Sequence, residues 1–118
     1  MRIAITSVKG MTVPIYGQKM IERLLEHDRC HITDIGTGWG ISSKIFLHYG
    51  FNVTGISLTD GLPTNLEKEH YIHIKDDLFL ASLPPADIVW ASMIIEHMTN
   101  VGLFLERCKE LTKPGGWL

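Results

Sequence analysis

The sequence predicts an α/β fold, a doubly wound and mostly parallel β-sheet with helices on both faces. Three observations predict it. Short runs rich in β-branched residues alternate with segments whose apolar residues have helical spacing. The run over 86–91 is apolar on both faces, as strands inside a parallel sheet are. A glycine-rich turn over 36–40 joins a predicted strand directly to a predicted helix, as the first turn of such folds does.

The first 30 residues are expected to contain an arm and one helix. Residues 3–8 are predicted to form either a short strand or an irregular arm. Pro14 suits the first turn of a helix because its ring fixes φ near a helical value. Apolar residues then follow at the spacing of one helical face, at Met20, Ile21, Leu24 and Leu25. The spacing predicts a helix over 14–27.

The middle of the chain is predicted to contain three strands around the glycine-rich turn. A strand over 32–35 runs into the turn. The helix after the turn ends at Gly50, where a left-handed residue costs glycine little. The apolar side of this helix is Ile41, Ile45, Phe46 and Tyr49. The next elements are a strand over 51–56, a turn over 60–63, a short helical turn over 65–69 and a strand over 71–74.

The last part of the chain is predicted to contain a fourth strand, a helix and the start of a fifth strand. The fourth strand covers 86–91 and the helix covers 100–111. The apolar side of the helix is Val101, Phe104, Leu105, Cys108 and Leu111. The sequence Lys-Pro-Gly-Gly over 113–116 stops the helix, and Trp117 and Leu118 are expected to begin the fifth strand.

Composition indicates one globular domain over 1–118. The chain has 118 residues, 45% of them hydrophobic and 20% charged, with a net charge of −2. This charge disfavours general nucleic-acid binding, and no apolar run is long enough to cross a membrane. Cys30 and Cys108 do not form a CxxC pair, so we expect reduced thiols in a cytoplasmic protein.

The glycine-rich turn has the features of a ligand-binding loop. Glycines let a ligand approach the backbone, and the following helix presents unpaired N–H groups. The glycines are Gly36, Gly38 and Gly40, so the third comes one residue earlier than in the dinucleotide fingerprint. An acid, Asp34, precedes the first glycine by two residues. The spacing therefore argues against a nicotinamide dinucleotide.

The segment Asp34-Ile35-Gly36-Thr37-Gly38-Trp39-Gly40 resembles the first motif of class I S-adenosylmethionine-dependent methyltransferases of the type 11/12 kind. The segment over 86–98 resembles the family's fourth-strand segment, and the segment over 111–116 resembles its L-K-P-G-G turn. The three blocks stand in the family's order between residues 32 and 118. The resemblance implies a Rossmann-like fold, S-adenosylmethionine as cofactor, and in-line methyl transfer to a small-molecule acceptor. It also divides the domain into an N-terminal arm and helix (1–30) and a cofactor-binding core (31–118).

The resemblance also implies roles for particular residues. Asp34 is expected to hold the methionine amino group, directly or through water. The cofactor is expected to approach the backbone of the loop residues Gly36, Thr37, Gly38 and Gly40. Ser57 stands where the family usually has an acid that binds both ribose hydroxyls, and a serine cannot match a bidentate carboxylate. Asp60 is an alternative partner for the ribose.

Further roles follow for the later segments. Asp77, or alternatively Asp76, is expected near the adenine amino group, with Leu78 beside the base. Ser92 and Met93 are expected to line the path between methyl donor and acceptor.

His97 is the nearest candidate for a general base, because it follows the fourth strand and its ordinary pKa is near neutral. The Glu96-His97 pair recurs in the family whatever the substrate, which favours a structural role instead. No metal site is expected, because His70 and His73 are three apart in a strand and so point to opposite faces.

The family's sheet has seven strands in the order 3-2-1-4-5-7-6, and this sequence stops as the fifth begins. The C-terminal strands are therefore missing. We expect a fragment, a truncated reading frame, or a subunit whose open sheet edge is covered by a partner or by a second copy of the chain. An alternative to an enzyme is a non-catalytic S-adenosylmethionine-binding module built on this core.

Overall fold

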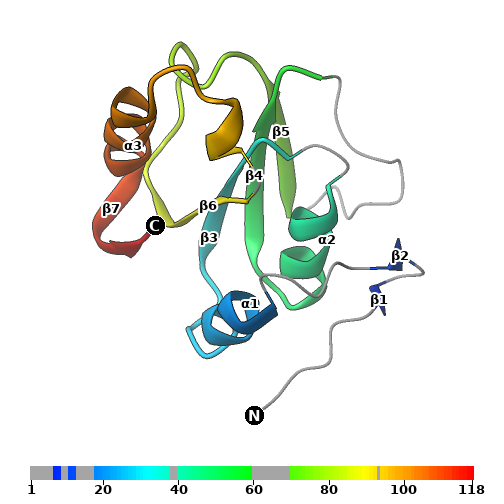
Figure 1. Cartoon of the computed structure of the whole chain (residues 1–118). Coiled ribbons are helices and arrows are strands. Elements are labelled where there is room, and N and C mark those ends of the chain that lie inside the picture. The colour runs from blue at the N-terminus through cyan, green and yellow to red at the C-terminus, as the bar shows by residue number, and fades with distance from the viewer. Residues whose placement is uncertain (1–6, 9–10, 13–17, 38–39, 60–69, 93) are drawn as a thin grey trace.

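A computed structural model describes residues 7–8, 11–12, 18–37, 40–59, 70–92 and 94–118 (Figure 1). Its centre is a five-stranded sheet in which every neighbouring pair is parallel. The strands follow the order β5-β4-β3-β6-β7. Their bounds are β3 (His31–Ile35), β4 (Asn52–Ser57), β5 (Tyr71–Lys75), β6 (Ala86–Ala91) and β7 (Thr112–Trp117). The chain builds outward from β3 first to one side and then to the other, which confirms the doubly wound α/β fold.

Helices cover both faces of the sheet (Figure 1). The helices α1 (Gln18–Leu24) and α2 (Ile41–His48) share one apolar cluster with residues of the strands, and α3 (Val101–Glu110) belongs to a second cluster. Side chains alternate along a strand, so Ile32 of β3 packs into the first cluster and Ile35 into the second. A short antiparallel pair, β1 (Ser7–Val8) and β2 (Met11–Thr12), and a 3₁₀ turn, η1 (Ile95–His97), complete the described elements.

Most predicted boundaries agree with the structure to within one residue. Asn100 caps the start of α3, because its Oδ1 accepts a hydrogen bond of 3.1 Å from the N–H of Leu103. Gly50 was predicted to end the second helix in a left-handed conformation. It lies just beyond α2, and its φ is +95°. The predicted strand over 86–91 is β6 without change. The helical turn predicted over 65–69 and residues 3–6 of the arm lie outside the described residues.

The predicted end of the first helix was wrong. The described helix ends at Leu24, and the N–H groups of Glu26 and His27 bond to carbonyls only three residues back. Arg29 fixes this turn, because its Nη1 donates to the carbonyls of Leu25 and His27 at 2.9 Å each. Residues 14–17, the predicted start of the helix, are not described.

Two predictions near the C-terminus were also wrong. The fifth strand, β7, already begins at Thr112, and Lys113-Pro114-Gly115-Gly116 forms an irregularity inside it. Ala86 pairs with Thr112 but Ile88 pairs with Trp117, and Gly115 accommodates the extra residues with a φ of +78°. The apolar side of α3 is narrower than predicted, since Val101 is 42% and Leu105 is 45% exposed.

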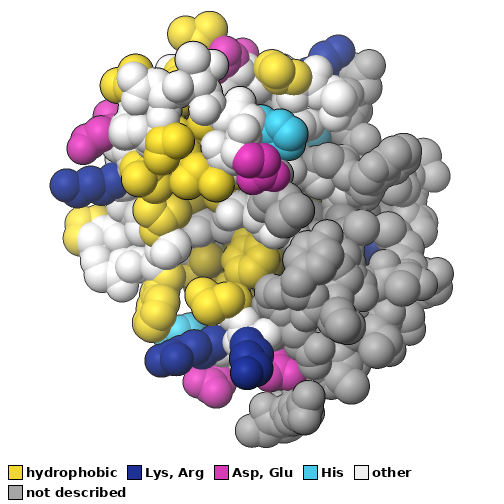
Figure 2. Space-filling model, viewed as in Figure 1, with side chains coloured by type: hydrophobic (Ala, Val, Ile, Leu, Met, Phe, Trp, Pro, Cys, Tyr) yellow, Lys and Arg dark blue, Asp and Glu magenta, His cyan; other side chains and the backbone are white. Residues whose placement is uncertain are grey.

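In the view of Figure 2, hydrophobic side chains gather near the middle of the molecule and charged side chains lie around them.

Candidate functional site

A cavity of about 280 Å³ lies at the carboxyl ends of β3, β4 and β5. Most of its lining is apolar, with a hydroxyl and two carboxyl side chains among it. The lining residues are Ile35, Gly36, Ile56, Ser57, Leu58, Asp76, Asp77, Leu78, Phe79, Ile94 and Met98. A few polar groups in an apolar hollow are typical of a small-molecule site, and ligands of open parallel sheets bind at this end of the strands.

Gly36 forms the part of the cavity wall that follows β3. Its φ is +69°, and a Cβ at this position would overlap Cδ1 of Ile94. Its N–H donates to the carbonyl of Ile56 in β4 at 2.9 Å, which holds the turn against the neighbouring strand. The positive φ therefore favours glycine here, and a larger residue would also displace the end of the Ile94 side chain.

Thr37 and Gly40, the other described residues of the loop, do not line the cavity. Thr37 is buried, and its Oγ1 lies 3.4 Å from the carbonyl of Ile56. Gly40 precedes α2 with a φ of +76°, and its N–H donates to the carbonyl of Thr37 at 2.8 Å. Gly38, predicted to contact the cofactor, lies outside the described residues.

Asp34 is buried on the α2 side of the sheet and does not line the cavity. Its Oδ2 accepts a hydrogen bond of 2.6 Å from Oγ of Ser43 in α2. Loss of water around the carboxyl group raises the pKa of Asp34 to about 7, although the bonds from Ser43 oppose this shift. The carboxyl group thus ties the beginning of the loop to α2.

Ser57, which was predicted to contact the ribose, is the last residue of β4 and lines the cavity. Its Oγ lies 3.2 Å from Nε2 of His73 in β5. His70 instead lies beside Asn52 at the start of β4, with Nδ1 3.0 Å from Oδ1 of the amide. Asp60, the alternative ribose partner, is not described.

The two acids after β5 both line the cavity, so both remain candidates for the adenine contact. Oδ1 of Asp76 accepts from the N–H of Asp77 at 2.7 Å, and Oδ1 of Asp77 accepts from the N–H of Phe79 at 2.8 Å. These bonds close a tight turn. The turn brings Leu78 and Phe79 into the cavity wall.

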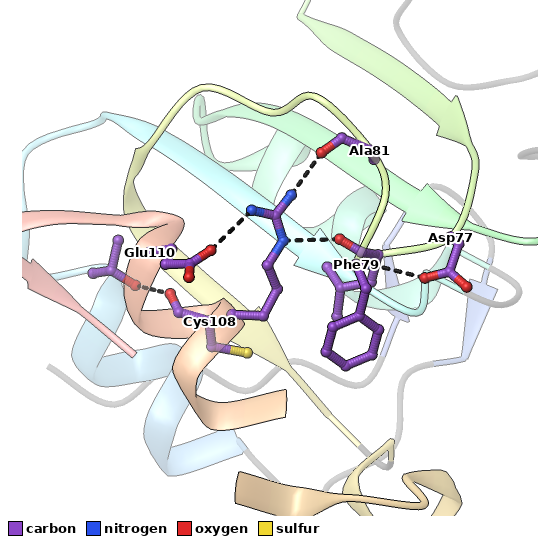
Figure 3. Close-up of polar contacts among 8 residues, drawn as sticks. Asp77, Phe79, Ala81, Cys108 and Glu110 are labelled. Atoms are coloured by element: carbon purple, nitrogen blue, oxygen red, sulfur yellow. Dashed lines mark hydrogen bonds and ion pairs between the residues drawn. The ribbon is translucent and has the colours of Figure 1, made fainter. Parts of the chain in front are cut away.

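Arg107 of α3 holds this turn from behind and was not predicted from the sequence. The dashed lines of Figure 3 join a guanidinium to backbone oxygens of the 78–81 segment and to Glu110, and these are the contacts of Arg107. Nε donates to the carbonyl of Leu78 at 2.9 Å and Nη2 to that of Ala81 at 2.6 Å, while Nη1 lies 3.2 Å from Oε2 of Glu110. The contacts join residues 26 and 29 positions apart, and no local sequence pattern reveals them.

The residues expected near the methyl acceptor lie beyond β6. Ser92 is half-buried and is not part of the cavity lining. The side chain of His97 is 74% exposed, and its Nε2 lies 3.6 Å from Oε1 of Glu96. Met93 lies outside the described residues. Among the residues that are described, no group of three or more His, Cys, Asp or Glu side chains could hold a metal ion.

Comparison with known proteins assigns this arrangement to a family. A family described as "Methyltransferase domain" matches residues 33–118, which is most of the chain. The chain belongs to this methyltransferase family. The match covers the glycine loop, the cavity and α3, and it confirms the family predicted from the three sequence blocks.

Curated relatives of this methyltransferase domain carry the name ubiquinone biosynthesis O-methyltransferase. The relative from Rhodopseudomonas palustris (strain BisB18) is 37% identical over 93 residues, covering 70% of this chain and 35% of the relative. The relative from Bordetella avium (strain 197N) is 29% identical over 96 residues, covering 74% of this chain and 40% of the relative. The chain thus spans well under half the length of these relatives.

Solved structures of similar fold are also methyltransferases. An S-adenosylmethionine-dependent methyltransferase from Mesorhizobium loti aligns with a TM-score of 0.72 at 19% identity. The glycopeptide N-methyltransferase MtfA aligns with a TM-score of 0.69 at 16% identity. Each alignment covers 86% of this chain and 50% of the other chain. Within the part of the chain that is described, no helix has the length and apolar character needed to cross a membrane.

Proposed function

We propose that the cavity beyond β3, β4 and β5 binds S-adenosylmethionine, and that the complete enzyme transfers its methyl group to a small-molecule acceptor. One observation carries the proposal: Gly36, Ser57 and Asp77 line a single cavity at the carboxyl ends of three neighbouring parallel strands. Membership of the methyltransferase family supports it, as does the S-adenosylmethionine dependence of the similar protein from Mesorhizobium loti.

The chain's own groups suit the parts of this ligand. Gly36 presents a backbone without a side chain, so the methionine portion can come close. The Ser57 hydroxyl faces the ribose, and Asp77, whose Oδ1 is already bonded to Phe79, offers Oδ2 to the adenine amino group. Leu78 and Phe79 supply apolar contact for the base. Asp34 is buried toward α2, so its contact with the methionine amino group would run through water.

The bound cofactor supplies a methyl group attached to a sulfonium sulfur, and this sulfur is a good leaving group. The protein therefore has to hold the cofactor, align the acceptor with the methyl group and exclude water. Ile94 and Met98 form the apolar wall next to Gly36 and would keep water out on that side. Ser92 follows β6, where it would border the path to the acceptor.

The acceptor is proposed to be a small molecule, and an oxygen acceptor is the first class to test because the curated relatives are named O-methyltransferases. Such an acceptor needs a group that takes its proton. His97 is the candidate for this role, and its high exposure leaves it accessible to an acceptor that arrives from solvent. Replacing His97 with alanine should lower transfer without changing cofactor affinity, and an unchanged transfer rate would exclude it as the base.

Calorimetric titration tests the cofactor proposal. The chain should bind S-adenosylmethionine and its demethylated product, and should not bind NAD. Gly36→Ala should weaken this binding, because alanine is strained at a φ of +69° and its methyl group would displace the end of the Ile94 side chain in the cavity wall. Gly102→Ala, on the exposed surface of α3, is the matched control and should bind normally. Binding of NAD alone, or of none of the three ligands, would contradict the proposal.

A second measurement separates an enzyme from a binding module. The chain is incubated with cofactor carrying a labelled methyl group and a panel of phenols, alcohols and amines. Label on an acceptor supports methyl transfer. Cofactor binding without transfer to any acceptor would favour the alternative, a module that binds S-adenosylmethionine and does not react.

A further inference from the structure

The end of β4 carries a polar network that the methyl-transfer proposal does not require. Oγ of Ser57 lies 3.2 Å from Nε2 of His73 and 3.2 Å from Oγ1 of Thr59. Nδ1 of His73 lies 2.8 Å from the hydroxyl of Tyr71. Tyr71 and His73 stand two apart in β5 and so point to the same face, with their rings stacked at 6.1 Å between centroids. The phenol, the imidazole and the cavity hydroxyl thus form a chain.

The partners of His73 fix where its proton lies. Nε2 is 3.1 Å from the backbone oxygen of Thr59, which can only accept a hydrogen bond. In the neutral imidazole Nε2 therefore carries the proton and Nδ1 accepts from the Tyr71 hydroxyl. Ser57 also faces the Nε2 proton, so its oxygen accepts and its own proton points elsewhere. Its possible acceptors on Thr59 are Oγ1 at 3.2 Å and the carbonyl oxygen at 3.4 Å, and both distances are long for an O–H···O hydrogen bond.

Gly55 makes room for this network in the middle of β4. A Cβ on Gly55 would overlap the Tyr71 hydroxyl and would lie 2.7 Å from Cγ2 of Thr37. The phenol therefore crosses β4 above Gly55 and reaches the residue that follows Gly36 in the glycine loop. This placement links the loop to the end of β4 through side chains and not only through the strand ladder.

We propose that His73 is a positioning residue that holds the Ser57 hydroxyl toward the cofactor's ribose, with Tyr71 anchoring His73 from behind. This inference rests on the proposed S-adenosylmethionine site. The pair Ser57–His73 replaces the acid that the resemblance leads one to expect at the end of the second strand. Ser57, oriented by the imidazole, exchanges its weak bond to Thr59 for one to a ribose hydroxyl. One neutral donor contacts one hydroxyl, where a carboxylate would contact two.

The test combines protein variants with altered ligands. S-adenosylhomocysteine and its 2′-deoxy and 3′-deoxy forms are titrated into the chain and into His73→Phe, which keeps a flat ring and removes both nitrogens. Loss of one positioned hydrogen bond should weaken binding of the full ligand by about tenfold. The deoxy form that lacks the contacted hydroxyl should bind both proteins equally. His73→Gln, whose amide can still donate at the ε position, should recover part of the loss.

Controls make the outcomes distinct. His70→Gln, at the start of the same strand region, should leave all affinities unchanged, because His70 bonds to Asn52 and not to Ser57. Ser57→Ala should weaken the full ligand as His73→Phe does, and the double variant should be no weaker than either. Equal weakening of the full and both deoxy ligands by His73→Phe, or no weakening at all, would overturn the inference while leaving the cofactor site intact. No binding of the full ligand to the unchanged chain would instead refute the cofactor site itself.

Discussion

Two sides of the cavity are held in place by different kinds of contact. The Ser57 side consists of Ser57, Tyr71 and His73, which bond to one another through neutral side chains of two adjacent strands. The Asp77 side is a backbone turn over 76–81, and a single cation, Arg107, binds two of its carbonyls. The first side depends on strand register and on the space above Gly55. The second depends on one long side chain from a helix on one face of the sheet.

Because the contacts differ, different substitutions should disrupt the two sides. A network of several partners fails when the space that it occupies is filled, whereas a clamp fails when its one donor is removed. Buried carbonyls without a donor cost free energy, so a cut clamp also destabilises the fold. The predictions below separate these two behaviours, beginning with the largest expected effect.

Asp34, whose charge also acts on Tyr71 of the Ser57 side, should make the stability of the fold depend on pH. Its pKa is about 7 in the folded chain against 3.8 in a model compound, so between these values the folded state binds more protons than the unfolded state. The free energy of unfolding should therefore fall as pH rises from about 4 to 7 and stay low above that. A shift of this size corresponds to a loss on the order of 4 kcal/mol.

Urea unfolding at pH 5 and pH 8 measures the effect. Asp34→Asn keeps an acceptor for Ser43 and cannot ionise, so its stability should change much less between the two pH values. Burial raises the pKa of Tyr71, and the charge of Asp34 raises it further, so ionisation of Asp34 acts on the Tyr71 network. Equal pH dependence in the wild type and in Asp34→Asn would contradict this assignment.

Filling the space above Gly55 should break the Ser57 side. Gly55→Ala places a methyl group on the Tyr71 hydroxyl and against Thr37, and overpacking of this kind costs about 3 kcal/mol. Tyr71→Phe in the same background removes the hydroxyl and should recover about 1 kcal/mol or more of the loss. Thermal and urea unfolding of the single and double variants measure this recovery, and purely additive losses would show that the two groups do not meet.

The strands, the glycine loop and the cavity could be predicted from the sequence because their signals are local. Glycine spacing, β-branched runs and cap residues each act within a few positions of the chain, so β6 and the ends of α3 were placed to within one residue. The start of β7 was misread because proline and glycine mark a bulge as well as a turn. Those residues stop a helix in either case, so the sequence alone does not separate the two.

The residues that support the cavity could not be predicted in the same way. Arg107 and its carbonyl partners are 26 and 29 positions apart and meet only because α3 packs beside the turn. His73 reaches Ser57 because β4 and β5 pair in the register that sets Ser57 opposite Lys75 and Gly55 opposite His73. Sequence reasoning weighed His73 only as a metal ligand with His70 and rejected that role. In the structure the two histidines bond to residues at opposite ends of β4.

Removing the clamp should test the Asp77 side. Arg107→Met keeps the apolar stem and leaves the carbonyls of Leu78 and Ala81 without their donor, which should cost about 2 kcal/mol of unfolding free energy. The turn should loosen, so affinity for S-adenosylhomocysteine should fall. Affinity for its 2′-deoxy and 3′-deoxy forms should fall by the same factor. Glu110→Gln is the control, since it weakens only an exposed ion pair and should change stability by less than about 0.5 kcal/mol.

The smallest effect should come from the start of α3, where a substitution should lower the free energy of unfolding and leave cofactor affinity unchanged. Asn100→Ala removes the cap on Leu103 and should cost about 1 kcal/mol of unfolding free energy. Arg107 lies nearly two turns further along the helix and keeps its carbonyl contacts, so cofactor affinity should not change. If Asn100→Ala weakens binding as strongly as Arg107→Met, the clamp acts through the stability of the whole helix. If affinity falls only in Arg107→Met, the guanidinium itself shapes the Asp77 side of the cavity.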